Sequence, residues 1–285
     1  MKITVTVLII FTIIFHSCKN ETKKTDTNLE NKNVDFPTYK LIGEGENIIV
    51  ESFDSTVIDL NKYNHNNIIF KVGTEFIYTY EHIRKDNKVQ FFKKTEDNSG
   101  WEFVDSDSIK VLPKNTLSIS VLDGNPLSNS IPEYNQTNLK YILFDELSFS
   151  ISGVIENEAN LWMHPPRDYY FKILELNPFP YIKAPYKIGN KWNWSLEIGD
   201  GWADERWKVW EGTIDNKYKY EIIDKINLET EFGQLDCYKI KSSAESRIGK
   251  TELTAFFNEK YGFVKLNYKN IDGTKTNLEL IKFNQ

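Results

Sequence analysis

Apolar and polar residues alternate with a period of two along most of the chain from Tyr39 onward. This period is typical of a β-strand with one buried face. Thr116–Leu122, for example, alternates leucine, isoleucine and valine with small hydroxyl residues. The other segments that predict strands are Glu75–Ile83, Lys88–Lys94, Tyr218–Ile226, Leu235–Lys241, Thr251–Phe257 and Phe263–Tyr268.

The longest alternating stretch is Leu139–Ile155, which predicts one half-buried strand or two strands joined by a bend near Asp145. Its large apolar residues fall at odd positions and its serines at even ones. We therefore expect Phe149 and Ile151 to face the core, with the serines on the opposite face.

Short turns separate the predicted strands. Asp86-Asn87, Phe232-Gly233 and Ile271–Thr274 each suit a tight hairpin. No amphipathic helix longer than about two turns is evident. The sequence therefore predicts an all-β fold, or a β-rich fold with short helices.

Seven of the nine prolines lie between Pro126 and Pro185. Because proline cannot donate a ladder hydrogen bond, this region predicts irregular connections or edge strands. We place a module boundary here, with a β-rich N-terminal part at 39–175 and a β-rich C-terminal domain at 176–285.

The N-terminus has the pattern of a secretory signal. Met1-Lys2 carries a positive charge, and Ile3–Phe15 follows as thirteen residues of which ten are apolar. As a helix this run spans about 20 Å, less than the hydrocarbon core of about 30 Å. Residues 1–17 therefore predict a cleaved signal peptide and not a membrane span.

Ser17-Cys18 then resembles the lipobox of bacterial lipoproteins, and the Asn-, Lys- and Ile-rich chain resembles outer-membrane lipoproteins of the Bacteroidetes. Phe15 and His16 depart from the commonest lipobox residues. The resemblance implies that Cys18 becomes the first mature residue and carries diacylglycerol and a further acyl chain such as palmitate. An ordinary secretory signal with a coincidental cysteine is the alternative. Residues 18–38 hold few apolar side chains, so they predict a flexible tether between the anchor and the folded part.

The C-terminal part, about residues 178–283, resembles a family of β-rich bacterial envelope domains of unknown function. The resemblance is carried by Gly189–Trp194, by Glu231–Ile240 and by Phe256–Lys265, although the proline usual near Glu231 is missing. It implies a curved antiparallel sheet of half-barrel type and no known catalytic residues. Some structurally similar domains cradle acyl chains, so lipid handling follows by analogy only.

Composition limits the function classes further. The chain is 40% hydrophobic and 14% aromatic, which excludes a disordered protein. Its net charge of −6 argues against a nucleic-acid partner. Two cysteines cannot build a disulfide scaffold or a four-cysteine zinc site, and no phosphate loop or serine-nucleophile motif is found. We expect no metal, no cofactor and no catalytic residue.

Five of the seven tryptophans lie within nineteen residues: Trp192, Trp194, Trp202, Trp207 and Trp210. One interpretation is an aromatic platform that binds a lipid, a sugar or an apolar peptide. The other, which we favour for most of the rings, is the interior of a small sheet. Because Trp207 has the opposite strand parity to Trp202, one regular strand cannot bury the whole group, and at least one ring should remain accessible.

Two further residues have alternative interpretations. His164 would suit an acid–base pair with Glu156, Glu158 or Asp168, but a proline-braced loop is the simpler interpretation. Cys237 lies within a predicted strand and is expected to be a buried packing residue. The acidic residues of the tryptophan segment lack the spacing of a calcium loop and are expected to form a solvated turn.

The sequence thus predicts an envelope lipoprotein in the outer membrane, facing the periplasm or the cell surface. Its expected function is non-enzymatic binding of an apolar or amphipathic ligand or of a partner protein. The alternative is an envelope hydrolase that acts on glycan or lipid. The partners expected are the membrane, through the anchor, and a lipid, glycan or protein.

The lipid anchor can be tested directly. In a native host, Cys18→Ser should abolish incorporation of labelled palmitate and move the protein to the soluble fraction, because two or three acyl chains hold a protein far more firmly than one. Cys237→Ser is the matched control and should keep both the label and the membrane fraction. A Cys18→Ser protein that still labels would contradict the lipoprotein assignment.

Overall fold

The computed structural model describes residues 40–44, 48–52, 67–97, 100–106, 115–124, 136–143, 149–157 and 159–285. Two short 3-10 helices, η3 (Tyr169–Leu176) and η4 (Asp200–Trp202), interrupt a succession of strands. The strands are β1 (Lys40–Glu44), β2 (Ile48–Ser52), β3 (Glu75–Ile83), β4 (Val89–Lys94), β5 (Trp101–Asp105), β6 (Thr116–Val121), β7 (Thr137–Ile142), β8 (Phe149–Glu156), β9 (Asn160–Met163), β10 (Tyr181–Lys183), β11 (Lys191–Ile198), β12 (Ile214–Thr230), β13 (Gly233–Ser246), β14 (Gly249–Asn258), β15 (Gly262–Lys269) and β16 (Lys275–Asn284).

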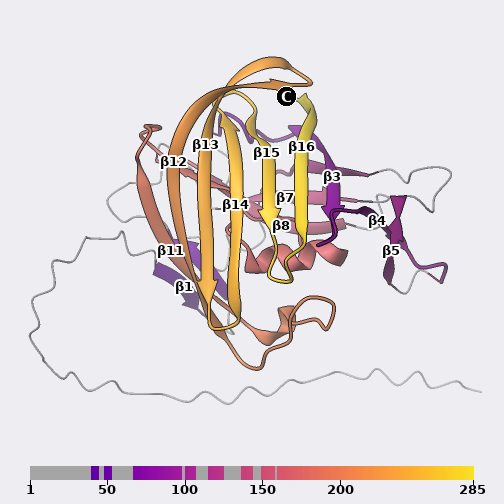
Figure 1. Ribbon diagram of the computed structural model, residues 1–285. Helices are drawn as coiled ribbons and strands as arrows, with labels where there is room; N and C mark the ends of the chain where they lie inside the picture. The colour runs from indigo at the N-terminus through magenta and orange to yellow at the C-terminus, as the bar shows by residue number, and fades with distance from the viewer. Residues whose placement is uncertain are drawn as a thin grey trace, which may run out of the picture. The chain divides into compact units, whose positions relative to one another are not determined.

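Fourteen of these strands form one antiparallel sheet (Figure 1). Its main path runs β10-β9-β8-β7-β6-β3-β16-β15-β14-β13-β12-β11, and β4 and β5 branch from β3. The pairing of β16 with β3 joins the C-terminal hairpins to the N-terminal ones. β1 and β2 pair only with each other. The fold is therefore all-β with short helices, which confirms the predicted class.

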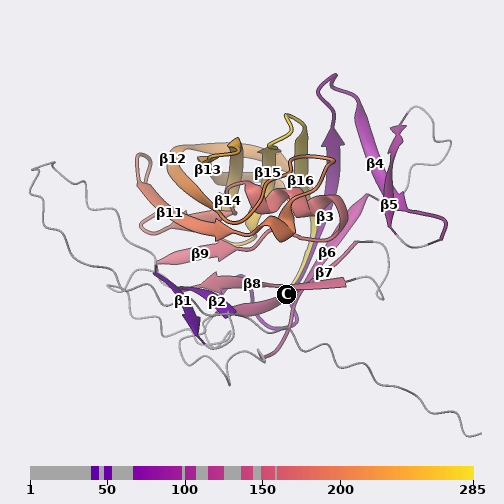
Figure 2. The same cartoon turned by 90° about the horizontal axis from the view of Figure 1, so that it is seen from below.

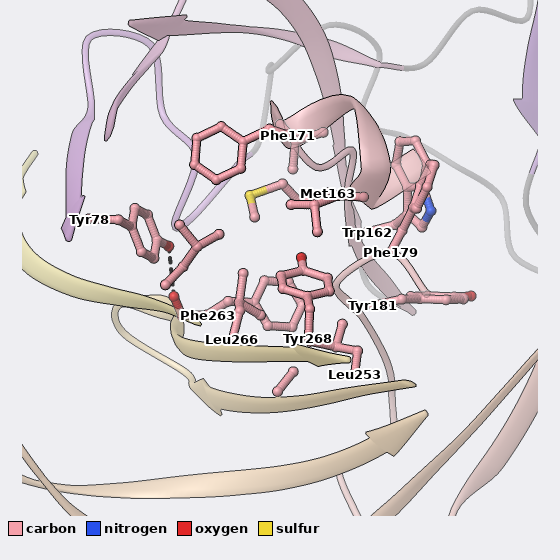
Figure 3. Packing of buried hydrophobic residues seen from close by; sticks show 14 of the residues in the cluster. Tyr78, Trp162, Met163, Phe171, Phe179, Tyr181, Leu253, Phe263, Leu266 and Tyr268 are labelled. Atoms are coloured by element: carbon pink, nitrogen blue, oxygen red, sulfur yellow. Dashed lines mark hydrogen bonds between the residues drawn. The ribbon is translucent and has the colours of Figure 1, made fainter. Parts of the chain in front are cut away.

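The inner side of the curved sheet is filled by the segment that connects β9 and β10. Figure 2 shows η3 between the side of the sheet formed by β12–β16 and the side formed by β6–β9. In Figure 3, Phe171 of η3 and Phe179 after it lie opposite Leu266 and Tyr268 of β15. All four side chains are at most 1% exposed. The interior therefore consists of packed side chains contributed by η3 and its flanks.

The two end strands of the sheet meet through aromatic rings. The rings of Tyr181 in β10 and Trp192 in β11 lie 5.5 Å apart. Those of Trp162 in β9 and Trp194 in β11 lie 6.1 Å apart, edge to face. No backbone ladder between β10 and β11 is found among the described residues. Side-chain packing thus brings the ends of the sheet together where a backbone ladder does not.

Most predicted strands are confirmed, several within one residue of their expected bounds. Leu139–Ile155 forms two strands, β7 and β8, as the second alternative proposed. The sequence did not single out β5, β9, β10 and β16. The boundary expected near residue 175 falls within η3, and the sheet continues on both sides of it. Among the described residues, no helix is long and apolar enough to cross a membrane.

The predicted faces are wrong for the first part of β8, although Ile155 is buried as expected. Phe149 and Ile151 are 49% and 41% exposed. Ser150 pairs with the buried Tyr141 of β7, and directly paired residues share a face, so the serines face inward. The ammonium of Lys140 lies 4.6 Å from the centre of the Phe149 ring on the outside. The residues of this part of β8 do alternate between two faces, but the serines face the core because pairing with β7 fixes the register.

A buried carboxylate attaches the segment before β3 to β8. Glu156 is 8% exposed. Its Oε1 accepts hydrogen bonds from the backbone N–H groups of Ile68 and Ile69 at 2.8 and 2.9 Å. Its Oε2 accepts one from Phe70 at 2.8 Å. These three charge-assisted bonds satisfy donors that would otherwise lie unpaired at the edge of the core.

Glu156→Gln tests this attachment. The amide keeps one acceptor oxygen and turns an N–H₂ group toward a backbone N–H, so the variant should lose about 1–3 kcal/mol of unfolding free energy. The measurement is urea unfolding of both proteins at neutral pH. Glu102→Gln, which removes a solvent-exposed partner of Lys93, is the control and should change stability by less than about 0.5 kcal/mol. Equal stabilities of the two variants would contradict this role for Glu156.

Candidate functional site

The tryptophan segment spans β11 and the irregular connection from β11 to β12. After β11, Gly199-Asp200-Gly201 begins the short helix η4, and a tight turn follows in which Asp204 pairs with Lys208. The Asp204 carboxylate accepts hydrogen bonds from the backbone and side chain of Arg206. These hydrogen bonds lower the pKa of Asp204. Because the connection is not a strand, strand parity does not decide which of its rings are buried.

Trp192 and Trp194 belong to the core. They stack on Tyr220 and Tyr218 of β12, with ring centres 5.3 Å and 4.5 Å apart. The Trp194 Nε1–H donates to the Tyr220 hydroxyl at 3.1 Å. Their position agrees with the favoured interpretation of these two rings as sheet interior.

Trp207 and Trp210, each 6% exposed, are also buried. The Trp207 Nε1–H donates to the backbone oxygen of Trp202 at 3.2 Å, which holds the two residues of the connection together. The ring of Trp207 also meets Tyr170 of η3 edge to face at 6.0 Å. The connection thus folds back on η3, and of the five rings only that of Trp202 is not buried.

Trp202 is flanked by two cations from the neighbourhood of η3. The guanidinium of Arg167 lies 5.3 Å from the centre of the ring, and the ammonium of Lys172 lies 5.7 Å from it. All three residues are partly exposed. We call these three residues the Trp202 surface. Cations on the face of an indole are attracted by the ring quadrupole, which holds them in place.

The sequence did not single out Trp101 of β5, which also belongs to this end of the molecule. Its ring meets Tyr170 at 5.8 Å, and the guanidinium of Arg206 lies 4.0 Å above it. Trp101 and Arg206 are separated by about a hundred residues along the chain, and no local pattern links them. Only the β4–β5 hairpin, folded beside η3, brings them together.

His164 is buried in a charged cluster whose members differ from those expected. Its Nε2 lies 3.3 Å from Oε2 of Glu175 in η3 and also contacts the guanidinium of Arg167. Its Nδ1 lies 2.8 Å from the Pro165 backbone oxygen. Of the partners that the sequence suggested, Glu156 binds backbone amides instead, and Glu158 lies outside the described residues.

The cluster keeps a carboxylate ionised in the core. Burial would raise the pKa of Glu175, but the charge and hydrogen bond of His164 and the charge of Arg167 hold it below its ordinary value. The backbone of His164 also donates to the Gly153 oxygen at 2.9 Å and accepts from the Tyr141 hydroxyl. The contacts therefore tie η3 to the end of β9.

Cys237 is fully buried, as expected. Burial, followed by the charge of Asp236, raises the pKa of its thiol to about 11. A thiol in this state is a poor nucleophile at neutral pH. Cys18 lies outside the described residues.

Two acidic residues of the segment are engaged by the loop itself. Asp200 accepts a hydrogen bond from the backbone N–H of Gly212 at 2.8 Å. Asp204 pairs with Arg206. In the part of the chain that the structure describes, no three acidic, histidine or cysteine side chains are grouped so as to hold a metal ion.

The pH dependence of stability tests the His164–Glu175 pair. A carboxylate whose pKa is lower in the folded than in the unfolded state stabilises fully above its unfolded pKa of about 4.3, and this contribution is lost as the pH falls through the folded-state value. Wild type should therefore exceed Glu175→Gln in unfolding free energy at pH 6, and the difference should shrink below pH 4. Urea unfolding measures both, with exposed Glu259→Gln as the control. A difference that does not change with pH would show that the ionised form of Glu175 is not what stabilises the fold.

No family model and no curated protein matches this sequence. Three solved structures resemble the fold in part. A proposed lipoprotein from Parabacteroides distasonis is 11% identical with a TM-score of 0.43, over 77% of this chain and 100% of that one. A proposed exported protein with a YmcC-like fold from Bacteroides fragilis is 11% identical with a TM-score of 0.41, over 80% and 100%. The hypothetical lipoprotein YmcC of Escherichia coli is 7% identical with a TM-score of 0.35, over 75% and 86%. Similarity at this level assigns no function.

Proposed function

We propose that this chain is a lipid-anchored protein of the cell envelope, in the outer membrane, that binds an amphipathic ligand at the Trp202 surface. The anchor is inferred from Ser17-Cys18 and the apolar run before it. The single observation that carries the binding function is Trp202. It keeps solvent contact between two cations, while the other four rings of its segment are buried.

The filled interior supports a binding site at the outside of the fold. Phe171, Phe179 and Trp162 occupy the space in which an open curved sheet would hold an acyl chain (Figure 3). A ligand would have to displace large buried rings, each worth several kcal/mol of packing. The Trp202 surface offers an aromatic face at no such cost.

The contacts of His164 favour binding over the alternative of an envelope hydrolase. A general base must reach a nucleophile or a water molecule. Both ring nitrogens of His164 instead contact Pro165, Arg167 and Glu175. These contacts give the cluster a structural role in holding η3.

Substitution of Trp202 tests the proposal. Binding of decyl maltoside, below its critical micelle concentration, is measured by isothermal titration calorimetry on the full chain. Trp202→Ala should weaken binding by about tenfold or more, as expected for an aromatic residue at the centre of a site. The matched control is Val209→Ala, which removes another exposed apolar side chain of the same connection and should leave affinity unchanged.

Two results would contradict the proposal. One is affinity that does not depend on Trp202. The other is cleavage of envelope glycan or lipid by wild type that is lost in His164→Gln, which would favour the hydrolase.

A further inference from the structure

We propose that the Trp202 surface recognises an anionic headgroup, so that the amphipathic ligand carries a phosphate or carboxylate group beside its apolar part. This inference rests on the proposed function and names the class of ligand. The proposed site is the juxtaposition of the indole of Trp202 with the guanidinium of Arg167 and the ammonium of Lys172, at 5.3 and 5.7 Å from the ring centre.

Lys172 has a positive charge with no carboxylate partner at ion-pair distance among the described residues. Lys265 and Lys269 of β15, by contrast, lie 3.0 Å from Glu279 and 3.4 Å from Glu252. The ammonium of Lys172 and the guanidinium of Arg167 both lie over the Trp202 ring. An anion bound at this surface would be attracted by the charge of Lys172.

Arg167 is held in place by buried neighbours. Its guanidinium contacts Nε2 of His164, and its charge helps to keep Glu175 ionised. Its Nε is buried and makes no hydrogen bond in the structure. Arg167 therefore presents a fixed charge to the indole, and a fixed guanidinium loses less conformational entropy on binding an anion than a mobile one.

Glu175 offsets the charge of Arg167 from the buried side, and the other nearby carboxylates do not neutralise Lys172. The charge of Lys172 contributes to the lowered pKa of Asp204. The oxygens of Asp204 accept hydrogen bonds from Arg206, however, so the Asp204–Arg206 pair is neutral. Asp200 is held by the backbone of Gly212. What remains is a partly exposed indole with positive charge at its face, which suits an anionic amphiphile better than a neutral one.

Headgroups on a common tail separate this inference from the proposed function. Isothermal titration calorimetry compares decyl phosphate, decyl phosphocholine and decyl maltoside below their critical micelle concentrations, together with sodium phosphate alone. Decyl phosphate should bind wild type about tenfold more tightly than decyl maltoside, and added salt should reduce the advantage. Sodium phosphate alone should bind far more weakly than decyl phosphate, because it lacks the apolar part.

Lys172→Gln should weaken the binding of decyl phosphate by about tenfold and so remove its advantage over decyl maltoside. Lys172→Arg should retain the preference. Lys208→Gln, which removes an exposed cation from the same connection, is the control and should change neither affinity.

Equal binding of all three amphiphiles, with loss of affinity in Trp202→Ala alone, would overturn the anionic preference and leave the binding function standing. Binding of sodium phosphate as tight as that of decyl phosphate would overturn the amphiphilic part of the inference. Binding that does not depend on Trp202 would overturn the proposed function as well.

Discussion

The structure depends on the side chains that fill the inner side of one long, curved antiparallel sheet. Its two end strands, β10 and β11, are not joined by a backbone ladder, so the sheet has no continuous hydrogen-bonded wall. Aromatic side chains hold the two ends of the sheet together instead. Tyr181 and Trp192 bring the end strands into contact, and η3 with its flanks fills the space between the two sides. Close packing of these rings replaces the hydrogen bonds that would close a barrel.

Under the proposed function, the packed interior excludes a binding site inside the sheet. A residue such as Phe171 or Phe179 cannot leave the core without a large loss of packing energy. The proposed site therefore lies on the outside, at the end of the sheet where η3, η4 and the β4–β5 hairpin meet. There the cations of Arg167 and Lys172 lie over the ring of Trp202, beside rings that are buried in the core.

Two buried carboxylates link the irregular segments to the sheet. An ionised group in a protein interior is costly unless each of its oxygens is paired. Glu156 meets this requirement with three backbone amides. Glu175 instead relies on the nearby charges of His164 and Arg167. The first attaches the segment before β3 and the second attaches η3. These carboxylates position two segments that make no backbone hydrogen-bond ladder with the sheet.

The sequence by itself determined the β class, most strand positions and the burial of Cys237, because an alternating pattern and a turn signal are local properties of the chain. It also placed a tryptophan-rich segment after β11. What it left open depended on distant partners. The faces of β8 followed from its register with β7, the partner of His164 came from η3, and the single partly exposed ring, Trp202, was selected by the folding of an irregular connection against η3. Such contacts join residues far apart in the chain, and only the tertiary structure brings them together.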